Sequence, residues 1–225
     1  MVELTLNLEP TQTLRYSVHV EPAGLRERKK QRTREQIAAA AARLFAEHGY
    51  ERVTVSDVAR AADVSEQTVY NYFPAKEHLV LDQDEALRDR LVQLVGDRPP
   101  GTSPAAAIRA EALAFVDGIA PMADDQVRGG LGSLAVVSPA VRRLSLEMTD
   151  RHAAAIAAAI AATAPDASPL LVRVRATALA SVFQTITDET GRRCRSGQSP
   201  AAIAAELKPL IAEIVDDLDR WLSAG

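Results

Sequence analysis

The first strongly periodic segment of the chain follows residue 24. Apolar side chains recur there at steps of three to four residues, at Ile37, Ala41, Leu44 and Phe45. This spacing marks one face of an α-helix, and the glycine that interrupts it, Gly49, is typical of a helix end. The pattern predicts an amphipathic helix over roughly residues 27–48. Thr33 and Gln36 have the spacing of a capping box and are expected to cap its beginning.

Two short helices are predicted between residues 53 and 80. Thr54 is expected to cap the first, with Asp57 three residues later, where a carboxylate favours the positive end of the helix. Asp63 then tolerates the left-handed conformation of a tight turn, and Ser65 caps the second helix. Two short helices joined by such a turn are the helix-turn-helix arrangement.

The second of these helices has an apolar face and a polar face. Val69 and Phe73 lie four residues apart and are expected to be buried. The outer faces then carry Gln67, Thr68, Tyr70, Asn71 and Tyr72. A helix of this kind fits the major groove of DNA, where Gln, Asn and Thr contact base edges while Tyr and Lys contact phosphates. The alternative is an ordinary helical hairpin, against which stand the exposed tyrosines and Lys76 at the next helix start.

The rest of the chain is also expected to be helical. Serine followed by proline heads four Ala/Leu-rich runs, at Ser103–Pro104, Ser138–Pro139, Ser168–Pro169 and Ser199–Pro200. Serine serves as N-cap and proline fits the first helical position, so each pair predicts a helix start. The run 153–164 reads as a closely packed helix, and Pro99–Pro100–Gly101 as a surface connection. No stretch is typical of a sheet, and the chain is predicted to be all-α.

Composition agrees with a helical, intracellular protein. The 225 residues include 41 alanines and only 4% aromatic residues, which favours a core of Ala, Leu, Val and Ile. A single cysteine, Cys194, excludes an intrachain disulfide and a thiol pair for zinc or an iron–sulfur cluster. We find no signal peptide and no run of about 18 apolar residues. We therefore expect a soluble protein without a membrane span.

Positive charge is concentrated at the start of the first predicted helix, although the chain has a net charge of −4. Six cations lie within nine residues: Arg26, Arg28, Lys29, Lys30, Arg32 and Arg34. Such a cluster is either a solvated helix face or a surface that phosphates neutralise. Its position one helix before the helix-turn-helix favours contact with phosphates.

An enzyme is the rival class. The four histidines are scattered, no Glu-x-x-His pair of a di-iron bundle occurs, and Asp124–Asp125 and Asp216–Asp217 lack the third carboxylate of a diphosphate-binding motif. No Ser/His/Asp set can be assigned. We therefore predict that the protein is not an enzyme and has no catalytic residue, metal or cofactor.

Residues 24–81 closely resemble the amino-terminal DNA-binding domain of the TetR (tetracycline repressor) family of bacterial transcriptional regulators. The resemblance rests on the helix spacing, on the helix end at Phe45 and Gly49, and on the junction YxYFPxK that begins at Tyr70. It implies a three-helix head over residues 25–80 and an all-helical body for effector binding and dimerisation over residues 81–225. Residues 1–24 are expected to be a flexible arm.

The resemblance also implies a function. A family member is a cytoplasmic, nucleoid-associated homodimer that binds double-stranded operator DNA and represses transcription until a small-molecule effector, here unknown, releases it. The alternative is a helical ligand-binding or adaptor protein with a degenerate DNA-binding head. Glu66, where many relatives have a cation or a neutral residue, is the only support for that alternative.

Individual roles follow by position. The family's backbone contacts correspond to Thr54, Ser65, Thr68, Tyr70, Tyr72 and Lys76, and its base readers to Gln67, Thr68 and Asn71. Arg32 of the basic run joins these DNA-binding candidates. Ala75 departs from the pattern because it replaces a serine that often caps the helix before Lys76.

The body has no motif of its own. Its candidates for an effector pocket are aromatic, polarisable or hydrogen-bonding side chains in Ala/Leu-rich helices: Phe115, Met148, His152, Phe183, Gln184 and Thr187. Near the end, apolar residues recur in a stripe made of Ile203, Leu207, Leu210, Ile214, Leu218 and Trp221. This stripe is either plain core or, as the resemblance favours, part of an intersubunit four-helix bundle with the helix 168–190.

Three further expectations concern local structure in the body. Pro209 should bend the last helix. Cys194 and its neighbouring arginines are expected to form a solvated helix end. A continuous helix from about Lys76 to Val95, closed by Gly96, is expected to serve as a rigid lever between head and body.

Overall fold

The computed structural model describes residues 25–81 and 84–223, with side chains from residue 28 onward. Every regular element in these ranges is helical, which confirms the predicted fold class. The predicted arm, residues 1–24, lies outside the described residues. In chain order the elements, with η for a 3-10 helix, are α1 (Leu25–His48), η1 (Tyr50–Arg52), α2 (Val55–Ala61), α3 (Glu66–Tyr72), η2 (Lys76–Leu79), α4 (Asp84–Gly96), α5 (Pro104–Asp117), α6 (Asp124–Arg128), α7 (Leu131–Ala135), α8 (Pro139–Thr163), α9 (Pro169–Arg195) and α10 (Pro200–Ser223).

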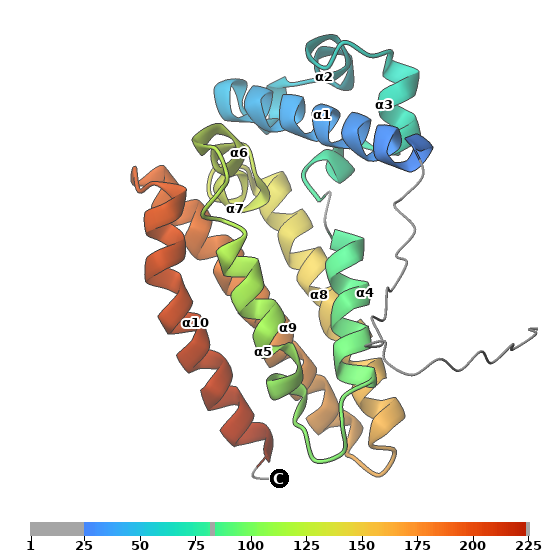
Figure 1. The fold of residues 1–225 in the computed structure, drawn as a ribbon, viewed down its shortest axis with the longest axis vertical. Helices are drawn as coiled ribbons and strands as arrows, with labels where there is room; N and C mark the ends of the chain where they lie inside the picture. Colours follow the sequence, from blue (N-terminus) through green and yellow to red (C-terminus); the bar gives the residue numbers. More distant parts are fainter. Residues whose placement is uncertain (1–24, 82–83, 224–225) are drawn as a thin grey trace, which may run out of the picture.

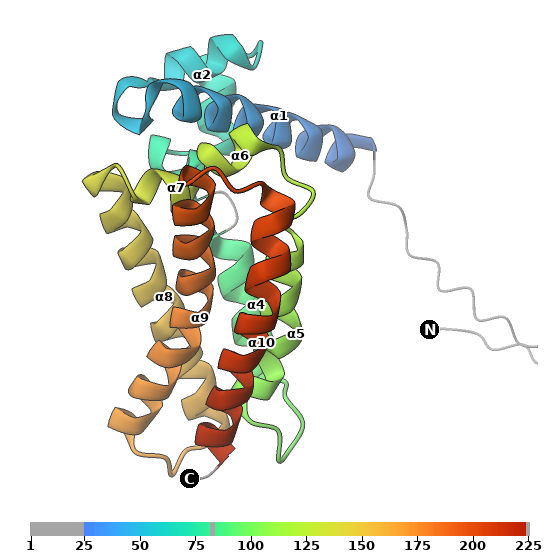
Figure 2. The same cartoon turned by 90° about the vertical axis from the view of Figure 1, so that its left-hand side faces the viewer.

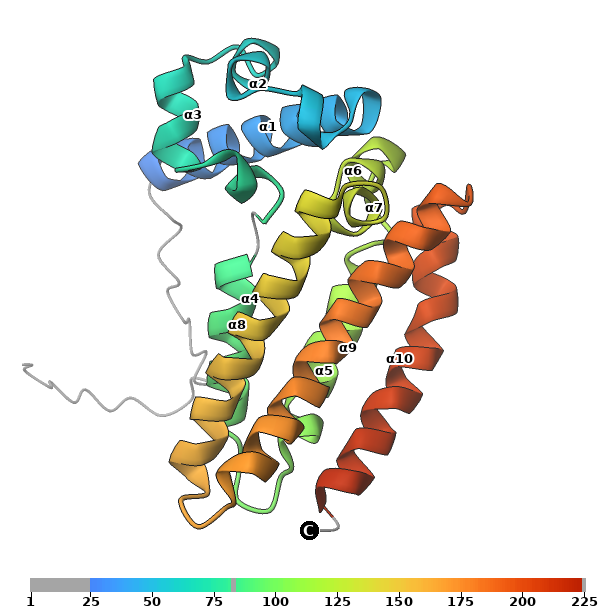
Figure 3. The same cartoon turned by 180° about the vertical axis from the view of Figure 1, so that it is seen from behind.

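Helices α1, α2 and α3 form a head that lies across one end of a long helical body (Figure 1). The body consists of α4, α5, α8, α9 and α10, which run roughly along the long axis (Figure 2). The short helices α6 and α7 lie at the end of the body that faces the head (Figure 3). They are therefore placed between the two parts.

The apolar core of the head continues into the body. Its largest buried side chains include Phe45 and Phe73, and the same cluster contains Leu134 and Val141 from the body. A second, larger cluster fills the body itself. The head is thus packed onto α7 and the start of α8, and the hydroxyl of Ser138 adds a hydrogen bond to Glu51 Oε1 at 2.6 Å.

Two close backbone approaches hold α6 and α7 between head and body. At Gly129, after α6, an added Cβ would lie 1.8 Å from the carbonyl oxygen of Ala42 in α1. At Gly132 in α7 it would lie 2.1 Å from the carbonyl oxygen of Thr187 in α9. Such contacts are possible only without a side chain. Two glycines therefore let this short segment touch both the head and the body through backbone atoms.

All four helix starts predicted from Ser-Pro pairs are confirmed. The hydroxyls of Ser103, Ser138 and Ser199 accept hydrogen bonds from backbone N–H groups in the first turn of their helices. Ser168 makes no such side-chain hydrogen bond. Proline at the first helical position still suits each start, because that position has no intrahelical N–H partner to lose.

Two predictions about helix ends are wrong. Helix α1 already begins at Leu25, so Thr33 lies inside it and donates its hydroxyl hydrogen to the carbonyl of Lys29 instead of capping. The lever expected over Lys76–Val95 is not one α-helix, because its first turn is the separate 3-10 helix η2. Ala75 offers no side-chain oxygen to cap that turn. The α-helical part begins at Asp84.

The last two helices also differ in part from prediction. Cys194 is buried, so it does not lie on a solvated helix end. Of the carboxyl-terminal stripe, Ile203 and Leu207 are core, whereas Leu210, Ile214 and Trp221 are exposed. The packed face is completed by Ile211, Val215 and Leu222. Successive residues turn by about 100° around a helix, so the exposed part of the stripe lies beside the packed face of α10. Helix α10 continues through Pro209.

No helix within residues 25–81 and 84–223 has the length and hydropathy needed to cross a bilayer.

Candidate nucleic-acid interface and body cavity

Helix α2 is fixed at its start by a complete capping box. The backbone N–H of Asp57 donates to Thr54 Oγ1 at 3.1 Å, and the backbone N–H of Thr54 donates to Asp57 Oδ2 at 2.9 Å. The Thr54 hydroxyl also donates to that carboxylate. These hydrogen bonds from Thr54, with a smaller contribution from Arg60, lower the pKa of Asp57. The predicted N-cap at Thr54 is therefore confirmed, and Asp57 completes it by accepting the backbone N–H of Thr54.

The turn and the start of α3 also follow the sequence prediction. Asp63 adopts φ 53°, the left-handed conformation that its short polar side chain tolerates. Ser65 then caps α3, since its Oγ accepts the backbone N–H of Thr68 at 3.1 Å and lies 2.8 Å from the Thr68 hydroxyl. Both ends of the turn are thus held by local hydrogen bonds, and the direction of α3 is set.

The two faces of α3 differ sharply in exposure. Val69 is fully buried and Phe73 is 1% exposed, whereas Tyr70 is 44% exposed. Gln67 and Asn71 are exposed one turn apart, and Gln67 Nε2 donates to Asn71 Oδ1 at 3.2 Å. Residues at i, i+3 and i+4 share one side of a helix. The outer side of α3 therefore presents a phenol and two amides together.

Helix α1 holds α3 and the turn from behind through contacts that sequence analysis missed. Arg34 donates to the carbonyl of Tyr72 at 3.1 Å, and its guanidinium lies 4.6 Å from the centre of the Phe73 ring. Gln36 Nε2 donates to the carbonyl of Ala62 at 2.8 Å. Arg34 of the basic run therefore supports the end of α3.

The two remaining cationic candidates lie in different surroundings. Arg32 is exposed on α1 beside the exposed Lys29 and Lys30. Lys76 is half-buried, and its Nζ lies 4.2 Å from the centre of the Tyr50 ring. Burial lowers the pKa of Lys76. Burial, then the charges of Glu77 and Glu51, raise the pKa of Tyr50 to about 12.

Two candidates for phosphate contact are less accessible than predicted. Tyr72 is partly buried and packs against the head core instead of lying on an outer face. Thr68 is half-buried, and its hydroxyl is engaged with Ser65. The hydroxyls of Thr54 and Ser65 thus serve first as helix caps, and the Thr68 hydroxyl pairs with that of Ser65.

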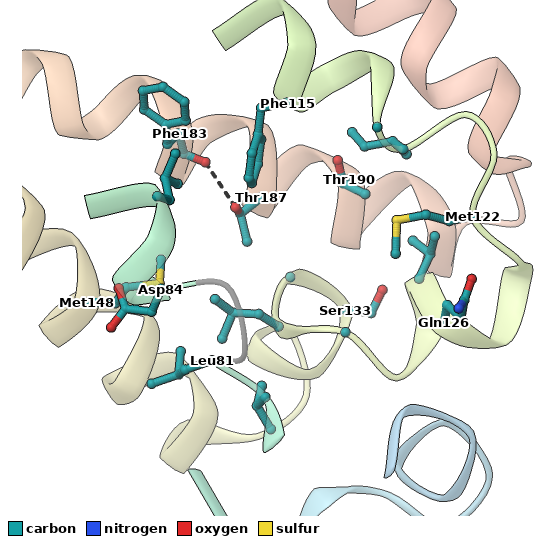
Figure 4. Close-up of a pocket in the computed structure, with 18 of the residues that line it drawn as sticks. Leu81, Asp84, Phe115, Met122, Gln126, Ser133, Met148, Phe183, Thr187 and Thr190 are labelled. Atoms are coloured by element: carbon teal, nitrogen blue, oxygen red, sulfur yellow. Dashed lines mark hydrogen bonds between the residues drawn. The ribbon is translucent and has the colours of Figure 1, made fainter. Parts of the chain in front are cut away.

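A cavity of about 530 Å³ opens in the body next to the head. It is lined by the segment after η2, by α4 and α5, by α6 and α7, and by parts of α8 and α9. Four of the six predicted pocket residues line it: Phe115, Met148, Phe183 and Thr187 (Figure 4). The rings of Phe115 and Phe183 meet edge to face, with their centres 5.7 Å apart. The size and apolar lining are typical of a small-molecule site.

The other two predicted pocket residues do not line the cavity. His152 is 1% exposed and lies behind a lining residue, Asp84, with Nε2 2.7 Å from Asp84 Oδ1. Gln184 is bonded to Ser145, Thr149 and Asp188. The helical periodicity of the sequence does not specify which neighbouring side chains His152 and Gln184 face.

Asp84 is the charged group that connects the cavity with the start of α4. Arg151 Nη2 lies 2.7 Å from its Oδ2, opposite the contact with His152. Burial by itself raises the pKa of Asp84, but the hydrogen bonds and charges of His152 and Arg151 together lower it. Within the described ranges there is no group of three or more His, Cys, Asp or Glu side chains arranged to hold a metal ion.

Residues 37–82 match the family model described as "Bacterial regulatory proteins, tetR family". The matched span contains the capped α2, the left-handed turn at Asp63 and α3. Over these residues the chain is similar to the TetR family.

Two curated transcriptional regulators are similar to parts of the chain. The chain is 33% identical over 111 residues to the HTH-type transcriptional regulator TcmR of Streptomyces glaucescens, a match that covers 49% of this chain and 48% of TcmR. It is 38% identical over 71 residues to the HTH-type transcriptional repressor KstR of Rhodococcus jostii, which covers 32% of this chain and 33% of KstR. The chain thus spans half or less of the length of these curated relatives.

A solved structure supports the fold. The transcriptional regulator FadR from Bacillus subtilis, solved in complex with stearoyl-CoA, aligns with a TM-score of 0.50 and 16% identity. The alignment covers 79% of this chain and 97% of the FadR chain. At this identity the likeness concerns only the arrangement of the helices.

Proposed function

We propose that this chain is a DNA-binding transcriptional regulator of the TetR family and not an enzyme. The observation that carries the proposal is the outer side of α3, where Gln67, Tyr70 and Asn71 are exposed while Val69 and Phe73 are buried. A short helix held by a cap and by its apolar face can enter a major groove with its polar side chains leading. This role places the protein with the bacterial nucleoid in the cytoplasm.

Within this proposal the exposed side chains have separate roles. Gln67 and Asn71 read base edges, because an amide offers both a donor and an acceptor. Tyr70 and Arg32 contact the phosphate backbone, which positions the helix without reading sequence. Lys76 also contacts the phosphate backbone, after its ammonium group moves away from the Tyr50 ring.

The caps and the partly buried Tyr72 act differently in the same proposal. Thr54 and Ser65 cap the starts of α2 and α3, Thr68 pairs with the Ser65 cap, and Tyr72 packs α3 against the head, so that both helices are positioned to face the phosphates. Loss of one of these hydroxyls is expected to lower affinity by loosening the helix. Loss of an amide on the outer side is expected to change base preference.

We further propose that the regulator is a homodimer formed through α9 and α10. An apolar surface remains exposed on these two helices in the single chain: Leu170, Leu171, Val174, Leu210, Ile214 and Trp221. Exposed apolar patches of this kind mark interaction sites. A two-fold dimer places two α3 helices about 34–36 Å apart, so the operator is expected to be an inverted repeat.

Binding to the DNA upstream of the protein's own gene tests the first part of the proposal. The full chain should protect an inverted repeat in a footprint, and Asn71→Ala should relax preference at particular base pairs by about 1–3 kcal/mol. Tyr70→Phe should weaken binding to all operator variants alike. Gln93→Ala, an exposed amide on α4, is the control and should change nothing.

Failure to bind any such DNA, with native circular dichroism, would favour the adaptor alternative in which Glu66 at the start of α3 repels phosphates. Sedimentation tests the dimer. Val174→Lys or Ile214→Lys should produce monomers, whereas Val136→Lys, an equally exposed apolar position on another surface, should not. A native monomer at micromolar concentration would contradict the dimer.

We also propose that the regulator is a repressor and that a small molecule in the body cavity releases it. The support is the position of the cavity, which is lined by α6 and α7, while Gly129 at the end of α6 contacts the backbone of Ala42 in α1. A ligand that changes the position of these short helices therefore acts on the head through backbone contact.

A further inference from the structure

Glu66 is an exposed carboxylate on α3 to which the proposed function gives no role. It is the first residue of the helix, directly after the cap at Ser65, and it lies one turn before the exposed Tyr70. Among the side chains that the structure describes, none makes a hydrogen bond or an ion pair with the Glu66 carboxylate. Helix α3 itself lies at an outer edge of the head (Figure 3). The carboxylate can therefore meet a partner outside the chain.

The polar groups near Glu66 differ from it because they already have partners. Gln67 Nε2 donates to Asn71 Oδ1 at 3.2 Å. The carboxylate of Asp57 accepts the backbone N–H and the hydroxyl of Thr54 as part of the α2 cap. Glu66 keeps its whole capacity to accept hydrogen bonds, and an ionised carboxylate only accepts. Its partner must therefore be a donor.

The base edges in a major groove differ in what they offer to a carboxylate. Guanine presents two acceptors, and thymine presents an acceptor and a methyl group. Adenine presents a donor, N6, beside an acceptor, N7, whereas cytosine presents only a donor, N4. A recognition helix contacts these edges with its N-terminal residues, and Glu66 is the first residue of α3. Its carboxylate is therefore best placed opposite cytosine.

We propose that Glu66 is a specificity-determining residue that reads one cytosine in each half of the operator, with its carboxylate accepting a hydrogen bond from cytosine N4. This inference rests on the proposed function and deepens it, because it names a base of the operator. The same negative charge repels phosphates, which weakens binding to DNA that lacks this cytosine. Glu66 thus raises specificity while it lowers non-specific affinity.

A purely structural role for Glu66 makes different predictions. An acidic residue in the first turn stabilises a helix without any DNA. Loss of such a charge would lower affinity for every DNA sequence alike. Loss of a base reader instead changes the preference at one position and, because a repelling charge disappears, raises non-specific affinity. Sequence dependence therefore separates the two roles.

Selection from random DNA locates the position that Glu66 reads. The full-length protein and each variant are incubated with random duplexes of about 30 base pairs, which hold two half-sites one helical turn or more apart, and the bound DNA is sequenced. The unaltered protein should select cytosine at one position of each half-site. Glu66→Gln should shift that position toward adenine, because a glutamine amide pairs with N6 and N7 of adenine. The other positions should stay the same.

Gel shifts on the selected duplex measure the size of the effect. Replacing this cytosine in one half-site by each of the other three bases, with its complement, should weaken binding of the unaltered protein by about 5- to 100-fold. Glu66→Ala should bind the four duplexes equally and random DNA more tightly than the unaltered protein does. Glu47→Gln removes an exposed carboxylate from α1 in the same head. This matched control should keep the full preference for cytosine.

Three results would overturn the inference. A cytosine preference that survives in both Glu66 variants would assign it to another side chain. Selection of DNA without a position that the Glu66 variants change would mean that the carboxylate contacts no base. A uniform loss of affinity in both variants, with the base preferences intact, would assign the charge to helix stability. Each of these results includes DNA binding and refutes this inference alone, whereas absence of binding to any duplex refutes the proposed function and this inference with it.

Discussion

Gly191 provides a sharp test of how closely α7 and α9 pack. It lies inside α9, and a Cβ added there would lie 2.1 Å from the carbonyl carbon of Gly132 and 2.6 Å from the nitrogen of Ser133. Carbon atoms in contact normally lie about 3.5–4.0 Å apart. In Gly191→Ala, α7 must therefore move away from α9 by roughly 1.4 Å or more.

The magnitude follows from two opposing effects. Alanine inside a helix is favoured over glycine by about 0.5–1 kcal/mol, whereas overpacking a core costs about 1–3 kcal/mol and occasionally more. Both obstructing groups are backbone, so no rotamer change relieves the clash. The cost of overpacking therefore lies at the upper end of its range, about 3 kcal/mol, and after subtracting about 1 kcal/mol for the helix preference we expect Gly191→Ala to lower the free energy of unfolding by a net of about 2 kcal/mol.

Urea unfolding followed by circular dichroism, at one fixed protein concentration, measures this change. Gly96→Ala at the end of α4 is the matched control, because a Cβ added at Gly96 meets no atom within 4 Å. It should raise the free energy of unfolding by up to about 1 kcal/mol. If Gly191→Ala unfolds within about 0.5 kcal/mol of the unaltered protein, the size of surface substitutions, the close approach of α7 and α9 is refuted.

Three other predictions test single residues. Thr54→Ala should lower the free energy of unfolding by about 1 kcal/mol, since it removes the α2 cap; urea unfolding checks this, and no change would contradict the cap. Gln184→Ala should cost about 1–3 kcal/mol, because it leaves buried partners unpaired, yet leave unchanged the affinity of the cavity for an apolar dye such as Nile red; a large loss of that affinity would return Gln184 to the cavity. Asp84 has a lowered pKa, so its stabilising effect is full above the unfolded value of about 3.9 and is lost as the pH falls toward the folded value. The difference in stability between the unaltered protein and Asp84→Asn should accordingly shrink below about pH 4, and a difference that grows there would contradict the assignment.

The head could be predicted closely because its decisive interactions are local. The caps at Thr54 and Ser65 and the turn at Asp63 each join residues no more than a few positions apart. Their chemistry can therefore be recognised in a short window of sequence. The hydrogen bond from Gln36 to Ala62 spans 26 residues, and a helical pattern specifies only that Gln36 is polar. For this reason the predicted capping box of Thr33 and Gln36 is wrong.

For the cavity, the sequence predicts only the kinds of side chain that line it. Aromatic and polarisable side chains in small-residue helices identified Phe115, Met148 and Phe183. Whether a polar residue faces the cavity or another helix depends on rotation and on distant partners, as the bond between His152 and Asp84, 68 residues apart, shows. Ser133, which lines the cavity, was missed for the same reason. The glycines around it, Gly132 among them, were the available signal, since glycines within short helices often mark close backbone approach.

The contacts of α6 and α7 also impose a quantitative condition on the proposed release from DNA. A ligand with equal affinity for both arrangements of head and body shifts nothing, however tightly it binds. Release therefore requires the cavity to have a different shape when two heads engage an inverted repeat. Because Gly129 touches Ala42 in the head while Gly132 touches Thr187 at the cavity, the segment between them cannot move at one end alone. Linkage then requires operator DNA to weaken a cavity ligand by the same factor by which that ligand weakens DNA binding. Titration of an apolar dye that binds the cavity, such as Nile red, with and without saturating operator measures one factor, and operator titration with and without the dye measures the other. Two equal factors above one establish coupling between the cavity and the operator, whereas a ligand affinity that operator DNA leaves unchanged identifies a constitutive DNA binder.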